Sequence, residues 1–89
     1  MANMNGKVAI ITGASSGFGK GTALAFAKEG CNLVLNARHE NNLKKVADEC
    51  TQFGVKVVYQ TGDAADEQVA RQTVQLALNT FGRIDELMF

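Results

Sequence analysis

Residues 8–12 form an unbroken apolar run, Val-Ala-Ile-Ile-Thr, that stops at a turn rich in glycine and serine. Apolar residues recur at helical spacing directly beyond this turn, so the stretch predicts a strand buried on both faces, a turn and then a helix. In such a unit the first backbone N–H groups of the helix and the positive end of its dipole point into the turn. The turn is therefore a candidate site for a phosphate group.

The glycines of this turn favour a bound anion. Gly17, Gly19 and Gly21 stand in the opening turns of the predicted helix, where each glycine costs about 1 kcal/mol relative to alanine. Close approach of a pyrophosphate to Gly13 and Gly17, and of the neighbouring strand to Gly19 and Gly21, would offset that cost, because a Cβ would clash at either kind of site. The alternative is a glycine-rich connection without a ligand, but the strand before it and the helix after it favour a nucleotide site.

Composition narrows the classes of partner. The 89 residues make one small domain at most, and nine basic and nine acidic residues give zero net charge, so neither nucleic acid nor an anionic membrane is expected as a partner. No run approaches the roughly 20 apolar residues of a membrane span and the start lacks the apolar core of a signal peptide, which predicts a cytoplasmic protein. Cys31 and Cys50 share no metal-ligand spacing with His39, so we predict no metal site and two reduced cysteines that pack in the core.

Strands and helices alternate three times along the chain. The predicted strands cover residues 7–12, 32–36, 55–60 and 84–89, and the predicted helices cover residues 17–29, about 40–53 and the stretch after Asp66 up to Phe81, each followed by a glycine. Apolar residues that share one face of the second helix are Leu43, Val46, Ala47, Cys50 and Phe53. Strands joined by helices of this length pair in parallel through right-handed crossovers. The predicted fold is therefore α/β, the first half of a doubly wound parallel (Rossmann) sheet with strand order 3-2-1-4.

The turn itself, Thr12-Gly13-Ala14-Ser15-Ser16-Gly17-Phe18-Gly19, resembles the Thr-Gly-x-x-x-Gly-x-Gly signature of the short-chain dehydrogenase/reductase family. This spacing differs from the G-x-G-x-x-G fingerprint of other Rossmann enzymes. Phe18 replaces the usual Ile, at a position where the contact is made mainly through the backbone. The resemblance implies that Gly13, Ser15, Ser16, Gly17, Phe18 and Gly19 bind a nicotinamide dinucleotide. It extends to Phe81-Gly82-Arg83-Ile84-Asp85, which is similar to the family's Phe-Gly-x-Ile-Asp element, so it covers residues 7–85.

The end of the second strand bears on the choice of cofactor. An NAD enzyme places an acidic residue there, about 20 residues beyond the glycine-rich turn, whereas this chain has Asn36, Ala37 and Arg38. The planar guanidinium of Arg38 can donate twice to a 2′-phosphate, and similar family members that prefer NADP(H) carry Arg at this point. We therefore predict NADP in preference to NAD. The alternative is that Arg38 is only a solvated residue after a strand. Ser15, at a position where many NADP-preferring members of the family hold a second cation, supplies none.

Two acidic residues follow the third strand. The resemblance implies that Asp63 accepts a hydrogen bond from the adenine amino group while the backbone of Ala64 donates to the ring. A helix cap is the alternative for Asp63, but Asp66 is better placed for that role because Asp66-Glu67-Gln68 opens the third helix. We assign no role to His39.

The resemblance implies an oxidoreductase that interconverts an alcohol and a carbonyl by hydride transfer. The family's catalytic Asn, Ser and Tyr-x-x-x-Lys belong to later segments, and Tyr59 has Asp63 rather than Lys four residues on, so we identify no catalytic residue. Residues 1–89 are thus expected to be a truncated N-terminal dinucleotide-binding segment of one Rossmann domain, inactive alone. The alternative is a complete, non-catalytic module that binds a nucleotide or another subunit. Substrate and reaction direction cannot be inferred.

The predicted fourth strand has an apolar outer edge, made of Leu87, Met88 and Phe89 and interrupted only by Glu86. Exposed apolar edges template pairing with other chains. We therefore expect self-association, and a homo-oligomeric parent protein.

Overall fold

Four parallel strands alternate with three helices between residues 4 and 88, the part of the chain that this computed structural model describes. The strands are β1 (Val8–Thr12), β2 (Asn32–Ala37), β3 (Val57–Thr61) and β4 (Glu86–Met88), and the helices are α1 (Gly17–Lys28), α2 (Glu40–Thr51) and α3 (Glu67–Phe81). The sheet order is β3-β2-β1-β4, which confirms the predicted α/β class and the doubly wound topology.

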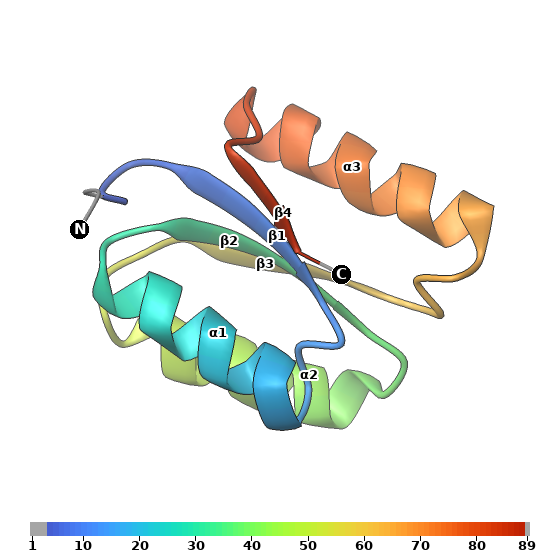
Figure 1. Cartoon of the computed structure of the whole chain (residues 1–89), viewed down its shortest axis with the longest axis horizontal. Helices are drawn as coiled ribbons and strands as arrows, with labels where there is room; N and C mark the ends of the chain where they lie inside the picture. Colours follow the sequence, from blue (N-terminus) through green and yellow to red (C-terminus); the bar gives the residue numbers. More distant parts are fainter. Residues whose placement is uncertain (1–3, 89) are drawn as a thin grey trace.

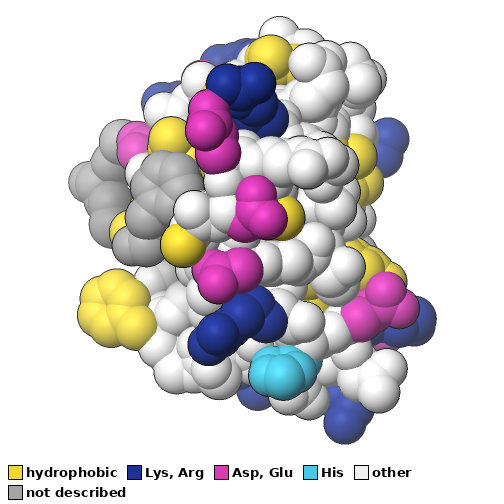
Figure 2. Space-filling view, turned by 90° about the vertical axis from the view of Figure 1, so that its right-hand side faces the viewer, with side chains coloured by type: hydrophobic (Ala, Val, Ile, Leu, Met, Phe, Trp, Pro, Cys, Tyr) yellow, Lys and Arg dark blue, Asp and Glu magenta, His cyan; other side chains and the backbone are white. Residues whose placement is uncertain are grey.

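The helices cover the two faces of this sheet unequally. Figure 1 shows α1 and α2 together on one face and α3 alone on the other. All strand pairs are parallel, so the carboxyl ends of the strands lie at one edge of the sheet, the edge that faces the viewer in Figure 2. Because β1 lies between β2 and β4, the chain reverses its direction of winding at β1, directly below the glycine-rich loop.

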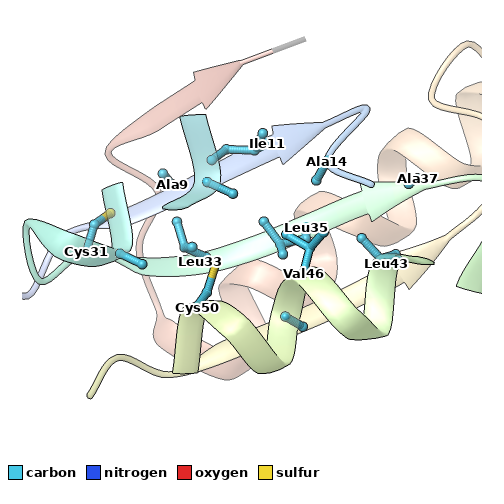
Figure 3. Close-up of a cluster of buried hydrophobic side chains, with 13 residues drawn as sticks. Ala9, Ile11, Ala14, Cys31, Leu33, Leu35, Ala37, Leu43, Val46 and Cys50 are labelled. Carbon is cyan, nitrogen blue, oxygen red and sulfur yellow. The ribbon is translucent and has the colours of Figure 1, made fainter. Parts of the chain in front are cut away.

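Alternating residues of the central strands fill two separate cores. The larger core lies between the sheet and α1 and α2, and Figure 3 shows Leu33 and Leu35 of β2 pointing toward Leu43, Val46 and Cys50 of α2. The smaller core lies under α3 and contains Val8, Ile10, Val34 and Ala77. Full burial of a side chain such as leucine contributes about 1.5–3 kcal/mol, so these contacts fix the strands on which the loops at the carboxyl edge depend.

Element boundaries differ from the predictions at a few places. The fourth strand begins at Glu86 rather than Ile84, because the Asp85 carboxylate accepts a hydrogen bond from the Val8 amide at 2.8 Å and pairs with Arg83. Phe89 lies outside the described residues. The second helix ends at Thr51, so Phe53 is 45% exposed beside Lys28, and its predicted place on the buried face is wrong.

The two cysteines are buried and free, as predicted for residues of the core. Burial raises the pKa of both thiols to about 11. Among the described residues no cluster of three metal-ligating side chains occurs, and no helix has both the length and the hydropathy needed to cross a bilayer.

Candidate functional site

The loop between β1 and α1 is held to the neighbouring strand by its backbone. The Ala14 amide donates to the Asn36 carbonyl of β2 at 3.0 Å, and Ala14 itself is fully buried. Gly13 and Gly17 have φ values of +64° and +56°, a conformation that other residues rarely adopt, and a Cβ at either position would point into open space. The loop therefore presents its backbone without side chains at these two points, as a phosphate-binding loop requires.

The first turn of α1 lacks the groups that usually satisfy a helix N-terminus. Ser16 is the N-cap residue, but its side chain makes no capping hydrogen bond, and the first turn contains no acidic residue. The first amide N–H groups of a helix have no partner within the helix, and they attract anions together with the helix dipole. This donor set fits a phosphate group.

Gly19 serves a different purpose from the two loop glycines. A Cβ at Gly19 would overlap the carbonyl oxygen of Gly13 and lie 2.7 Å from its carbonyl carbon. Glycine is therefore required at this position because α1 approaches the glycine-rich loop closely. The prediction had placed the neighbouring strand, not the loop, against Gly19. A Cβ at Gly21 would meet nothing within 4 Å, so the prediction of a close approach at Gly21 is wrong.

The end of β2 supplies the second wall of the site. Arg38 and His39 follow the last residue of β2 and are exposed. Figure 2 shows the histidine of the described chain, in cyan, beside a basic side chain on this face. Arg38 forms no ion pair or hydrogen bond with any residue between 4 and 88, whereas Arg71 and Arg83 are both paired. Its guanidinium group is thus available to an anion.

The loop after β3 supplies the third wall. The Gly62 amide donates to the Ala37 carbonyl at 3.0 Å, which joins this loop to β2. Asp63 is exposed, and its Oδ1 accepts from the Ala65 amide at 2.9 Å. Asp63 does not cap α3, because the Asp66 side chain does so by accepting from the Gln68 amide at 2.9 Å, in the role predicted for it. This turn holds Asp63 at the edge of the site and leaves its Oδ2 without a hydrogen-bond partner among residues 4–88.

The three segments enclose a cleft of about 510 Å³ at the carboxyl edge of the sheet. Six of the nine predicted site residues line it: Gly13, Ser15, Ser16, Arg38, Asp63 and Ala64. The other three, Gly17, Phe18 and Gly19, line a second recess of about 440 Å³, with Thr12, Thr22 and Met88. Gly13 and Ser16 line both cavities, so the two recesses adjoin across the glycine-rich loop.

Phe18 is the most conspicuous side chain of the second recess. It is 87% exposed, on the first turn of α1, and packs in neither core. Its ring therefore lies open to solvent at the rim of the second recess.

Four residues that line the larger cleft were not predicted as site residues: Asn36, Ala37, His39 and Gly62. His39 lines it next to Arg38, although no role was predicted for it, and Asn36 lines it although it drew attention only as a position without an acid. Asn36 is 1% exposed within a strand whose other central residues are apolar. A lone polar residue near the carboxyl end of a buried strand was the signal that could have found it.

The cleft has the size and the chemistry of a nucleotide site. It offers amide donors, an arginine without an ion-pair or hydrogen-bond partner among residues 4–88, and a carboxylate acceptor, each on a different loop at a topological switch point.

Known structures resemble this chain closely. L-sorbose reductase from Gluconobacter frateurii, solved with NADPH and L-sorbose, superposes with a TM-score of 0.91 at 39% identity over 97% of this chain and 34% of that protein. An alcohol dehydrogenase from Thermococcus sibiricus, complexed with 5-hydroxy-NADP, gives a TM-score of 0.86 at 39% identity over 91% of this chain and 35% of the other.

Sequence relatives agree with these structures. 11-beta-hydroxysteroid dehydrogenase B of Sesamum indicum is 39% identical over 87 residues, 97% of this chain and 24% of the relative. The chain thus spans about a quarter of the length of that relative. The family model for short chain dehydrogenases matches residues 7–89, nearly the whole sequence. The glycine-rich loop and the strand order of the sheet agree with this match, and the chain belongs to the short-chain dehydrogenase/reductase family.

Proposed function

We propose that this chain is the NADP(H)-binding segment of a short-chain oxidoreductase that interconverts an alcohol and a carbonyl. The observation that carries the proposal is the cleft, in which the glycine-rich loop, Arg38 and Asp63 face a common space, and Arg38 has no ion-pair partner in the described part of the chain. Two structural neighbours were solved with NADPH or a derivative of NADP, which supports the same ligand class for this chain.

Each wall of the cleft then has a role in binding. The amide groups at the start of α1 receive the pyrophosphate, since the side chain of the N-cap residue Ser16 does not cap them. Asp63 accepts from the adenine amino group through its carboxylate, and the Ala64 amide donates to the ring. Arg38 binds the 2′-phosphate, and its planar fork allows two charge-assisted hydrogen bonds to one phosphate.

The second recess receives the nicotinamide half of the cofactor. It lies on the other side of Gly13 and Ser16 from the larger cleft, so one extended dinucleotide passes over the loop and occupies both. Phe18 and Met88 line this recess. A bound cofactor would donate or accept the hydride, while the residues of this chain would bind and orient it.

Calorimetric titration of the 89-residue chain with NADPH and with NADH tests the proposal. We expect saturable binding of both, with NADPH about tenfold tighter, because an exposed charge-assisted contact to the 2′-phosphate contributes about 1.5 kcal/mol. Equal affinity for the two cofactors would reject the assignment of Arg38, and no binding of either would reject the proposed function as a whole.

A further inference from the structure

Asn36 occupies the point at which all three walls of the cleft meet. Its backbone carbonyl accepts from Ala14 of the glycine-rich loop at 3.0 Å. Its side-chain Nδ2 donates to the carbonyls of Gln60 at 2.8 Å and Gly62 at 3.2 Å, the last part of β3 and the start of the Asp63 loop. One residue of β2 therefore contacts both the loop before α1 and the loop before α3.

An asparagine side chain is energetically unfavourable at this buried position. It is 1% exposed on the face of the sheet that carries Ile10 and Val34, where an apolar side chain would be buried without penalty. Its Oδ1 is buried and accepts no hydrogen bond between residues 4 and 88. An unsatisfied buried acceptor destabilises a fold, so the benefit must lie in the two donated bonds.

The orientation of the amide is fixed by its neighbours. Turning it over would place Oδ1 against two carbonyl oxygens, and acceptors repel one another. The NH₂ group is thus held on the carbonyls of Gln60 and Gly62. In the sequence, Gln60 lies three residues before Asp63 and Gly62 lies one residue before it. Gly62 is further constrained by α3, since a Cβ there would lie 2.8 Å from a methyl carbon of Val69.

We propose that Asn36 is a positioning residue for the adenine end of the cleft, an inference that rests on the proposed function. It acts through Asp63 and Ala64, because it holds their segment at a fixed place relative to the glycine-rich loop. Without its two donated bonds the segment keeps the backbone bond from Gly62 to Ala37 but loses its link through the Asn36 side chain. Asp63 and Ala64 then spend less time in the arrangement that binds adenine.

Titration of the 89-residue chain with two probes, adenosine 5′-phosphate and adenosine 2′,5′-bisphosphate, tests this role. Asn36→Leu keeps the branched arrangement of four side-chain heavy atoms and has no donor, and we expect it to weaken binding of both probes about tenfold. The ratio of the two affinities should stay unchanged, because that ratio reports the 2′-phosphate and hence Arg38. Binding by Asn36→Leu as tight as that of the unmodified chain would overturn the proposal.

Thr73→Val is the matched control. Thr73 is also buried and polar and also borders the small cavity beside Asn36, but its hydroxyl donates within α3, to the Val69 carbonyl at 2.8 Å. We expect this variant to lower the free energy of unfolding while both affinities stay within twofold. An equal loss of binding in Thr73→Val would show that general loosening explains the effect, and would overturn the proposal.

A double-mutant cycle separates positioning from folding. In an Asp63→Ala background, Asn36→Leu should weaken adenosine 5′-phosphate binding by less than threefold, because the group that it positions is gone. A full tenfold loss in that background would contradict the mechanism. If Asn36→Leu does not fold, Asn36→Thr replaces it as the test variant. Asn36→Thr keeps one hydroxyl donor, and its affinity for adenosine 5′-phosphate should fall about threefold. An unchanged affinity in Asn36→Thr would contradict the proposal. Absence of binding by the unmodified chain would instead reject the proposed function.

Discussion

Replacement of Arg38 by aspartate should reverse the cofactor preference of this chain. Arg38 lines the cleft, is exposed, and has no ion-pair partner among residues 4–88. Loss of an exposed charge-assisted contact to the 2′-phosphate costs about 1.5 kcal/mol of binding, the low end of the usual range. A carboxylate about 5 Å from a phosphate adds roughly 1 kcal/mol of repulsion at moderate salt. Together these terms predict about seventyfold weaker NADPH binding.

Binding of NADH should change in the opposite direction. The new carboxylate can accept hydrogen bonds from the two ribose hydroxyls, as acidic residues do at this position in NAD-binding folds. Calorimetric titration of NADPH and NADH with the unmodified chain and the variant gives all four affinities. The difference in NADPH affinity between the unmodified chain and Arg38→Asp should shrink as the salt concentration rises, because salt screens interactions between exposed charges.

Arg71→Asp is the appropriate control because it makes the same change in net charge elsewhere. Arg71 is exposed on α3, pairs with Glu67, and lies outside the residues that line the cleft. It should leave both affinities within twofold. An unchanged NADPH to NADH ratio in Arg38→Asp, or an equal shift in Arg71→Asp, would refute the reasoning.

Four further outcomes follow from the structure. Gly19→Ala should abolish cofactor binding and lower the free energy of unfolding measured in urea, because its Cβ would overlap the Gly13 carbonyl. Gly21→Ala has open space for its Cβ and should raise that free energy by about 0.5–1 kcal/mol. A Gly19→Ala variant with unchanged stability and binding would contradict the packing of α1 on the loop. Hydrogen bonds from Arg83 and the Val8 amide hold the pKa of Asp85 below its ordinary value of 3.8, so Asp85 stabilises the fold at neutral pH, and that contribution is lost as pH falls below 3.8; the pH dependence of unfolding should weaken in Asp85→Asn and should not persist unchanged. The outer edge of β4 carries Leu87, 49% exposed, so sedimentation should detect association of the chain that Leu87→Lys reduces, and a monomer in both cases would count against it. The 89-residue chain should consume no NADPH in the presence of ketones, because no proton donor is assigned to it, and steady consumption by mass-verified protein would disprove this.

The fold was predictable because its signals are local and agree with one another. A buried run followed by helical periodicity marks each strand-helix unit, and the crossover rule then allows few sheet orders. Six of the nine residues predicted for the site meet in one cleft for the same reason: parallel strands bring their following loops to a common edge.

The errors arose where tertiary packing decides. Gly21 looks equivalent to Gly19 in the sequence, yet only Gly19 meets the Gly13 carbonyl, which depends on how α1 settles on the loop. Phe53 follows the periodicity of α2 but lies past its end. The role of Asn36 depends on hydrogen bonds to carbonyls 24 and 26 residues away, which no local pattern encodes.

The central claim is that the carboxyl edge of this sheet binds NADP(H), and amide chemical-shift mapping tests it most directly. Titration of ¹⁵N-labelled chain with NADP⁺ should shift, with a common saturation curve, the amide signals of Gly13 to Gly19, Arg38 and Asp63 to Ala64, while those of the outer face of α3 stay in place. Saturable shifts confined to β4 or α3, or no saturable shift at all, would contradict the account.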